Sequence, residues 1–177
     1  MTMQDIAAAL ARAQGVLERR PEAGMHDDAG AVARWEGDLR VVASHANGSQ
    51  AGTDMPSELG GGGTRVTPGW LFRAGIASCA TTSIAMLAAS EGLALDELEV
   101  RVESSSDARG LFGLKDEHGV RVPSASCNLR LAVRIRAEGA PPARLEALVE
   151  ESLRRSPIPN AVEKATAIAV RVDTGAD

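Results

Sequence analysis

Aromatic side chains are nearly absent from this 177-residue chain, which has two Trp, two Phe and no Tyr. A platform that stacks nucleic-acid bases or sugar rings would therefore have little material to work with. The 19 basic and 24 acidic residues leave a formal charge of −5, so no net positive field attracts phosphates. We therefore predict no nucleic-acid partner.

Cysteine and histidine are also rare, with two and three residues. Cys79 and Cys127 lie in different contexts, and neither belongs to a C-x-x-C motif or has a histidine at ligand spacing. The histidines, His26, His45 and His118, stand in polar, loop-like segments that are typical of solvated side chains. We predict neither a metal site nor a bound cofactor.

An uninterrupted hydrophobic span is lacking as well. The amino terminus has no basic residues ahead of an apolar run, and Arg73 breaks the most apolar stretch, from Trp70 to Leu95. The sequence therefore predicts neither a signal peptide nor a membrane association, and we expect a cytoplasmic protein.

What the chain does contain is an ordered series of amphipathic and apolar segments. The apolar spacing predicts helices over 5–19, 68–92 and 141–156, whereas alternation predicts strands over 31–36, 39–45, 98–103, 129–135 and 168–172. Loops are expected over 46–67 and 104–122. This order indicates the α+β class, with one antiparallel sheet covered on one face by helices. We expect an N-terminal helix and connection over 1–30 and a single domain over 31–177.

The segment from Pro68 to Gly92 is apolar almost all round, which is typical of a buried helix. Proline suits the first helical turn because its missing N–H would be unpaired there, and Gly92 suits a C-terminal stop. A monomer of this size does not readily cover such a helix on all sides. A second copy of the chain is the simplest source of the remaining cover, so a homodimer is predicted.

Cys79 lies about three turns into that helix, and its local sequence leaves two interpretations open. It is either a small apolar side chain in the core or a reactive thiol, and a reactive thiol mid-helix needs a cation from another segment. Cys127 opens the strand that contains Leu129 and Leu131, and its parity places it on their apolar face. Cys127 is therefore predicted to be structural.

Several blocks of sequence, in order, resemble the OsmC/Ohr family of thiol-dependent hydroperoxide-reducing proteins. They cover most of the chain from about residue 30 and are Met55–Gly63, Pro68–Cys79, Glu91–Leu93, Leu98–Val100 and Ser156–Ala161. The resemblance implies an OsmC-like fold, with an antiparallel sheet, a long buried central helix and an intertwined homodimer. It also implies active sites at the subunit interface.

In this resemblance Cys79 falls on the peroxidatic cysteine. Its thiolate would attack a peroxide, become a sulfenic acid and be restored by thiols. An arginine from the N-terminal strands would stabilise the thiolate, and either Arg34 or Arg40 occupies that neighbourhood.

The sequence departs from the family pattern at two positions. Ser156 stands where the resolving cysteine is expected, so the intramolecular disulfide is lost unless Cys127 replaces it. That replacement needs α-carbons within ~7 Å, which we do not expect. Gly69 stands where a glutamate would order the arginine, and Glu58 is a candidate substitute.

Three hypotheses follow. The leading one is an OsmC-like stress-response protein with peroxiredoxin-type activity, in which Cys79 reduces organic hydroperoxides or peroxide in a one-cysteine cycle with an external thiol reductant. The alternative is a non-catalytic dimer that binds a small lipophilic ligand in an interface pocket near Trp70 and Phe72. The third is a purely structural dimer.

Overall fold

The computed structural model describes residues 2–175, and its central element is the helix α2 (Pro68–Ser90). Thr67 caps this helix by accepting a hydrogen bond from the Trp70 amide at 3.2 Å, and Pro68 occupies the first turn. Gly92 follows with a φ of 68°, the left-handed conformation that glycine adopts at helix ends. The predicted long helix and both of its boundary signals are confirmed.

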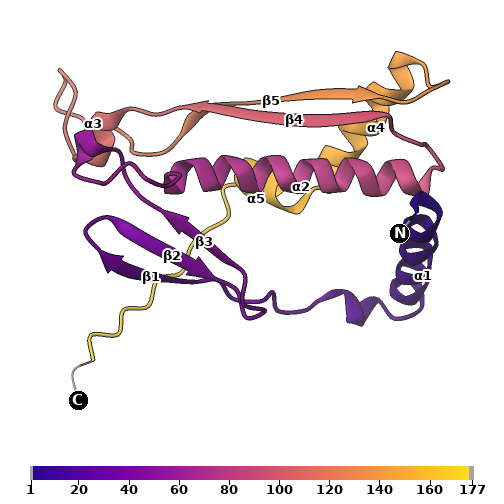
Figure 1. Ribbon diagram of the computed structural model, residues 1–177, viewed down its shortest axis with the longest axis horizontal. Coiled ribbons are helices and arrows are strands. Elements are labelled where there is room, and N and C mark those ends of the chain that lie inside the picture. The colour runs from indigo at the N-terminus through magenta and orange to yellow at the C-terminus, as the bar shows by residue number, and fades with distance from the viewer. Residues whose placement is uncertain (1, 176–177) are drawn as a thin grey trace.

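The strands β4 (Glu97–Ser105) and β5 (Cys127–Arg136) form an antiparallel hairpin that runs along α2 (Figure 1). Its apolar side chains alternate with charged ones, as the sequence predicts, and the inner face packs against α2. The outer face carries exposed ion pairs such as Arg134 and Arg136 with Glu97, each at 3.6 Å.

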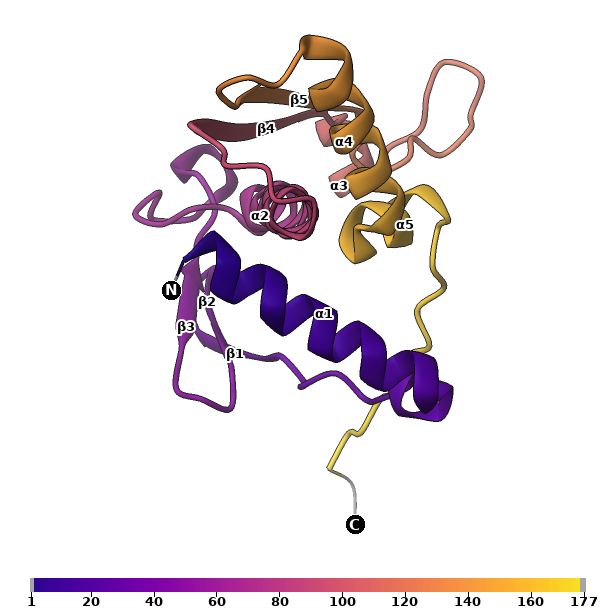
Figure 2. The ribbon, with the colours of Figure 1, turned by 90° about the vertical axis from the view of Figure 1, so that its right-hand side faces the viewer.

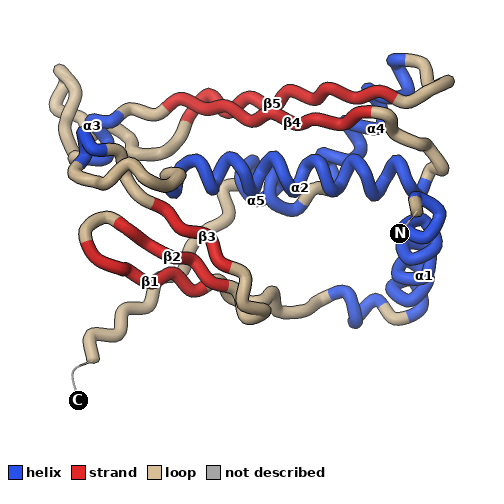
Figure 3. Tube along the Cα trace, in the orientation of Figure 1, coloured by secondary structure: helices blue, strands red, loops and turns tan. Residues whose placement is uncertain are grey.

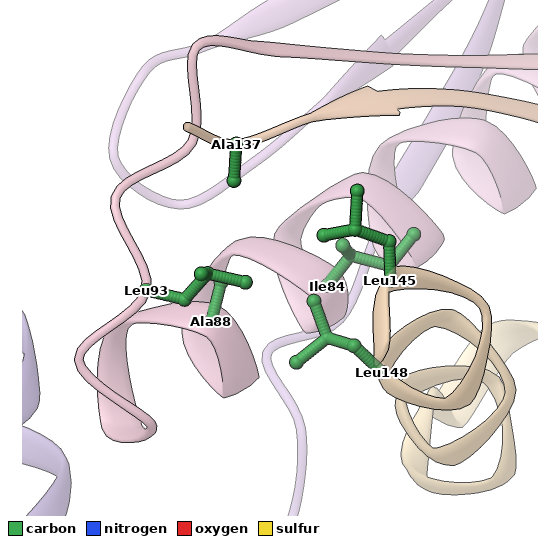
Figure 4. Close-up of a cluster of buried hydrophobic side chains, with 6 residues drawn as sticks. All are labelled: Ile84, Ala88, Leu93, Ala137, Leu145 and Leu148. Atoms are coloured by element: carbon green, nitrogen blue, oxygen red, sulfur yellow. The ribbon is translucent and has the colours of Figure 1, made fainter. Parts of the chain in front are cut away.

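The helices α4 (Pro142–Arg155) and α5 (Pro157–Glu163) close the core beside α2. Figure 4 shows the central cluster of buried side chains, which comprises Ile84, Ala88, Leu93, Ala137, Leu145 and Leu148. On α2 the buried residues Ile76, Ala80, Ile84 and Ala88 recur every four positions, and therefore form one face.

The opposite side of α2 is not covered within one chain. Met86 on that side is 42% exposed, and Trp70 and Phe72 in the first turns are 48% and 40% exposed, as expected of a helix that a single chain does not cover on all sides. Within the described residues the hairpin, α4, α5 and α1 contact α2, and together they leave these side chains exposed. By length and mean hydropathy (1.4) α2 alone could also cross a membrane, a test that the core helix of a soluble protein passes equally.

The N-terminal strands form a second sheet. β1 (Val32–Gly37), β2 (Arg40–Ser44) and β3 (Gln50–Thr53) are antiparallel in the order β1-β2-β3, which confirms the strands predicted over 31–36 and 39–45. This sheet does not join β4 and β5 within the described residues, so the predicted single sheet is wrong (Figure 3). The segment expected to be a loop before α2 supplies β3 and a short 3-10 helix, η2 (Ser57–Leu59).

The N-terminal helix α1 (Met3–Arg19) crosses one end of α2, and a 3-10 turn, η1 (Pro21–Gly24), follows it (Figure 2). Its first turn is closed by a capping box between Thr2 and Asp5. Met3 packs against the core cluster, so α1 is attached to its own chain.

The last predicted strand is absent from the described residues. From Thr166 to Gly175 the chain has no regular structure, and Ile168, Val170 and Val172 are 87%, 81% and 77% exposed. A strand exists only when another strand accepts its hydrogen bonds, and the single chain provides none here. The segment 104–122, expected to be a connection, contains the short helix α3 (Ala108–Leu111) and a bridge between Lys115 and Arg121.

Candidate functional site at Cys79

The sulfur of Cys79 lies against the junction between α4 and α5. Its Sγ is 3.2 Å from the Oγ of Ser156, a residue 77 positions away in the sequence. The backbone amide of Ile158 also donates to Sγ, at 3.5 Å. Cys79 is partly buried, so one part of its surface remains accessible. The structure therefore brings Cys79 and Ser156 together, two of the residues that the sequence singled out.

The junction that meets the sulfur is rigidly built. Ser156 is completely buried and begins α5, and Pro157 occupies the first position of that helix. The side-chain amide of Asn160 donates to the carbonyl oxygens of Leu153, Arg154 and Ser156, at 3.1, 3.0 and 2.8 Å. Leu153 and Arg154 belong to the last turn of α4, and the carbonyls of Leu153 and Ser156 also accept backbone hydrogen bonds, from the amides of Ser156 and Asn160. Asn160, which the sequence analysis did not single out, therefore fixes the position of the junction.

The two predicted arginines lie on the N-terminal sheet. Arg34 is exposed on β1, and Arg40 on β2 pairs with Asp38 at 3.3 Å. Within residues 2–175, the hydrogen bonds to the Cys79 sulfur come from Ser156 and Ile158 and from no arginine. A single chain thus does not bring a guanidinium to the thiol, and the arginine role remains a prediction for the assembled protein.

Cys127 is not the core residue that strand parity predicts, because it is exposed at the start of β5. The pairing with β4 shifts there: Arg130 lies opposite Glu103, whereas Cys127 lies opposite Ser105, which leaves one extra residue on β5. Asn128, inside this bulge, has a φ of 51°. A bulge reverses the alternation of side chains, which is why the parity argument fails. Both cysteines are free thiols in the structure.

The aromatic residues Trp70 and Phe72 lie in the first turns of α2 and are 48% and 40% exposed. They do not line the apolar groove of about 680 Å³ that lies between β5 and α4. Gly69 is adjacent to them, and Glu58 accepts a hydrogen bond from the Ser57 hydroxyl. In one chain the predicted ligand pocket is an exposed surface, which only a partner subunit could enclose.

The loop ahead of α2 is organised by Asp54, a residue that the sequence analysis missed. Its fully buried carboxylate accepts hydrogen bonds from the amides of Met55, Gly62 and Thr64 and from the Thr64 hydroxyl. A Cβ at Gly61 would lie 1.9 Å from the Met55 carbonyl oxygen, so only glycine fits there. An aspartate followed by a run of glycines was the available signal, since both residue types favour such turns.

Burial of Asp54 opposes its ionisation, but the hydrogen bonds from three backbone amides and the Thr64 hydroxyl outweigh burial and lower the pKa of Asp54 below its ordinary value of 3.8. A carboxyl with a lowered folded-state pKa stabilises the fold above its unfolded value, and this contribution is lost as the pH falls through the folded value.

Asp54→Asn is therefore expected to lower the Tm at pH 7 by on the order of 5 °C, because the amide group turns a donor toward backbone donors. The difference from wild type should shrink as the pH falls below 3.8. Thermal unfolding followed by circular dichroism measures both effects. The exposed Asp27→Asn is the matched control, and an equal Tm for all three proteins at pH 7 would contradict the role of Asp54.

A family model described as OsmC-like protein matches residues 60–171 of the chain, which is more than half of its length. The chain belongs to the OsmC-like family. The match includes Cys79, Ser156 and the junction that joins them. No curated protein sequence matches this OsmC-like chain significantly.

Solved structures share the fold of the OsmC-like chain. An OsmC-like protein from Mycoplasma pneumoniae is 15% identical, with a TM-score of 0.63 over 78% of this chain and 89% of that one. An organic hydroperoxide resistance protein OsmC from Legionella pneumophila is 25% identical, with a TM-score of 0.55 over 77% and 91%. An organic hydroperoxide resistance protein from Elizabethkingia anophelis is 19% identical, with a TM-score of 0.55 over 78% and 89%.

Proposed function

We propose that this OsmC-like protein reduces organic hydroperoxides or hydrogen peroxide with the thiol of Cys79, and that it acts in the cytoplasm. The observation that carries the proposal is the setting of Cys79, a partly buried residue whose sulfur shares a hydrogen bond with the Ser156 hydroxyl and accepts one from a backbone amide. Membership of the OsmC-like family supports it, as does the similarity to proteins described as organic hydroperoxide resistance proteins.

The first step is attack of the Cys79 thiolate on the terminal peroxide oxygen. A sulfur–oxygen bond forms, the oxygen–oxygen bond breaks, and the leaving alkoxide takes up a proton to become an alcohol or water. The sulfur is oxidised by two electrons and the peroxide is reduced by two. The product on the protein is a sulfenic acid at Cys79.

Regeneration requires thiols from outside the chain. The hydroxyl of Ser156 cannot form a disulfide, and Cys127 lies exposed in the bulge at the start of β5. One external thiol condenses with the sulfenic acid, which gives a mixed disulfide and water. A second thiol then displaces Cys79 as a free thiol, so that the reductant leaves as its own disulfide.

The protein is proposed to act as an intertwined homodimer. Three observations support this: the uncovered apolar side of α2, the unpaired segment with Ile168, Val170 and Val172, and the apolar groove along β5, which could receive such a segment. A partner's N-terminal sheet would also be free to bring Arg34 or Arg40 to Cys79, which one chain does not do.

The proposal is tested by exposing the reduced protein to stoichiometric cumene hydroperoxide or hydrogen peroxide with a sulfenic-acid trap, followed by intact-mass spectrometry. Wild type and Cys127→Ser are expected to gain one trap adduct within the mixing time, and Cys79→Ser none. An unlabelled wild type, folded and dimeric, would rule out the peroxidase and leave the non-catalytic binding of a small lipophilic ligand as the candidate function.

A further inference from the structure

The hydroxyl of Ser156 differs from the other hydroxyls of the helices in where its hydrogen bond goes. Ser152, one turn earlier on α4, is also buried, and its Oγ donates to the Leu148 carbonyl at 2.7 Å. Thr81 on α2 donates to the Ala77 carbonyl at 2.8 Å in the same way. This bond to the carbonyl four residues back is the usual arrangement for such residues. Ser156, by contrast, has the Cys79 sulfur as the described partner of its hydroxyl.

We propose that Ser156 is a dedicated hydrogen-bond donor to the Cys79 sulfur, and that it favours the reactive thiolate over the thiol. This inference rests on the proposed function, which needs that thiolate. It assigns the serine a chemical task, in which its hydroxyl stabilises the anion in the absence of a second thiol at this position.

The direction of this hydrogen bond depends on which atom carries the proton. Either atom can donate while Cys79 is a thiol, but a thiolate has no proton, so the Ser156 hydroxyl must then be the donor. Hydrogen bonds to an ionised acceptor are about twice as strong as those between neutral groups. The interaction is therefore stronger when the sulfur is ionised than when it carries its proton.

The burial of Ser156 strengthens its hydrogen bond to the Cys79 sulfur. Ser156 is fully removed from solvent, so water does not compete for its hydroxyl, and Asn160 holds the Ser156 carbonyl from the other side. The Ile158 amide adds a second donor to the same sulfur at 3.5 Å. Both groups belong to the junction, so a peroxide must approach the sulfur from another side.

The test measures alkylation of Cys79 by iodoacetamide as a function of pH, in a Cys127→Ser background so that a single thiol reports. Ser156→Ala is expected to slow alkylation at pH 7 roughly tenfold and to move the rising limb of the rate profile to higher pH. The rate on the alkaline plateau, where the thiol is fully ionised, should not fall. Ser152→Ala, which removes an equally buried serine one turn earlier, on α4, should leave the whole profile in place.

If the pH profile of alkylation of Ser156→Ala coincides with that of the Cys127→Ser parent, the inference is wrong. It is also wrong if Ser152→Ala shifts the profile by the same amount. A fall on the alkaline plateau, which indicates general disruption of the site, also counts against it. The measurement uses no peroxide, so its result is separate from that of sulfenic-acid trapping. If the sulfenic acid is trapped but Ser156→Ala does not shift the alkylation profile, the peroxidase proposal stands and the role of Ser156 is wrong. If the profile shifts but no sulfenic acid is trapped, the role of Ser156 stands and the peroxidase proposal is wrong.

Discussion

Ser156→Cys is expected to give a protein that closes a disulfide between Cys79 and the substituted position when it is mildly oxidised. The Sγ and Oγ atoms are 3.2 Å apart in the wild type, and a small side-chain rotation would bring two sulfurs to the bonding distance of about 2.05 Å. After one equivalent of peroxide, the intact mass should fall by about 2 Da because two thiol hydrogens are lost, and no trap adduct should accumulate. The oxidised product is therefore expected to change from a sulfenic acid in the wild type to an almost complete disulfide in Ser156→Cys.

The matched control is Ser152→Cys, which places a thiol at a buried position of α4 whose wild-type hydroxyl bonds to the Leu148 carbonyl. This variant should keep the wild-type trap adduct and form no internal disulfide. If Ser156→Cys instead remains fully trappable while folded, the junction does not meet Cys79 in solution as it does in the structure. That result would remove the basis for the hydrogen-bond role of Ser156 as well.

The second large effect concerns the exposed C-terminal segment. In an extended chain, Val170 lies on the same face as Ile168 and Val172, whereas Ala169 lies on the other. In the proposed homodimer this segment of one chain occupies the groove along β5 of the other. Val170→Asp is then expected to weaken the dimer more than a hundredfold, on the order of 3 kcal/mol, because the variant loses an apolar side chain and places a carboxylate in that groove.

Analytical ultracentrifugation over a concentration series measures this change, with Ala169→Asp as the control on the opposite face. The control is expected to remain a dimer at concentrations where Val170→Asp is a monomer. Equal dissociation constants for both variants and the wild type would show that the segment does not lie in the interface. A wild-type monomer at all concentrations would contradict the proposed dimer itself.

The sequence predicted the long helix and the first two strands because capping and turn residues close to each element determine where it begins and ends. The cap at Thr67, Pro68 and the glycine at 92 define α2, and the two-residue turn Asp38–Leu39, directly after Gly37, joins the first two strands. The last strand could not be predicted correctly for one chain, because alternation shows that a segment has two faces and not that a partner strand is present. The same alternation misplaced Cys127, since a single extra residue in the bulge reverses it.

In the candidate site, too, the sequence predicted some residues and missed others. Cys79 and Ser156 came from family resemblance, and their contact across 77 residues was invisible to periodicity or composition. Asp54 and Asn160 were missed because their importance lies in the backbone groups that they bind, which only the folded chain brings together. The pairing of Arg65 with Glu36 at 3.1 Å, which ties the loop before α2 to the N-terminal sheet, is another contact of this kind.

The amide of Asn160 also links the chemistry of the site to the thermal behaviour of α4. Its two hydrogens serve three carbonyl oxygens of the last helical turn, so at least one hydrogen is shared. Helix ends fray at temperatures well below global unfolding, and fraying here would carry Ser156 and the Ile158 amide away from Cys79. The reactivity of Cys79 would then decline on warming while the core cluster remained packed. The reaction rate of this thiol would therefore report local fraying of the α4–α5 junction.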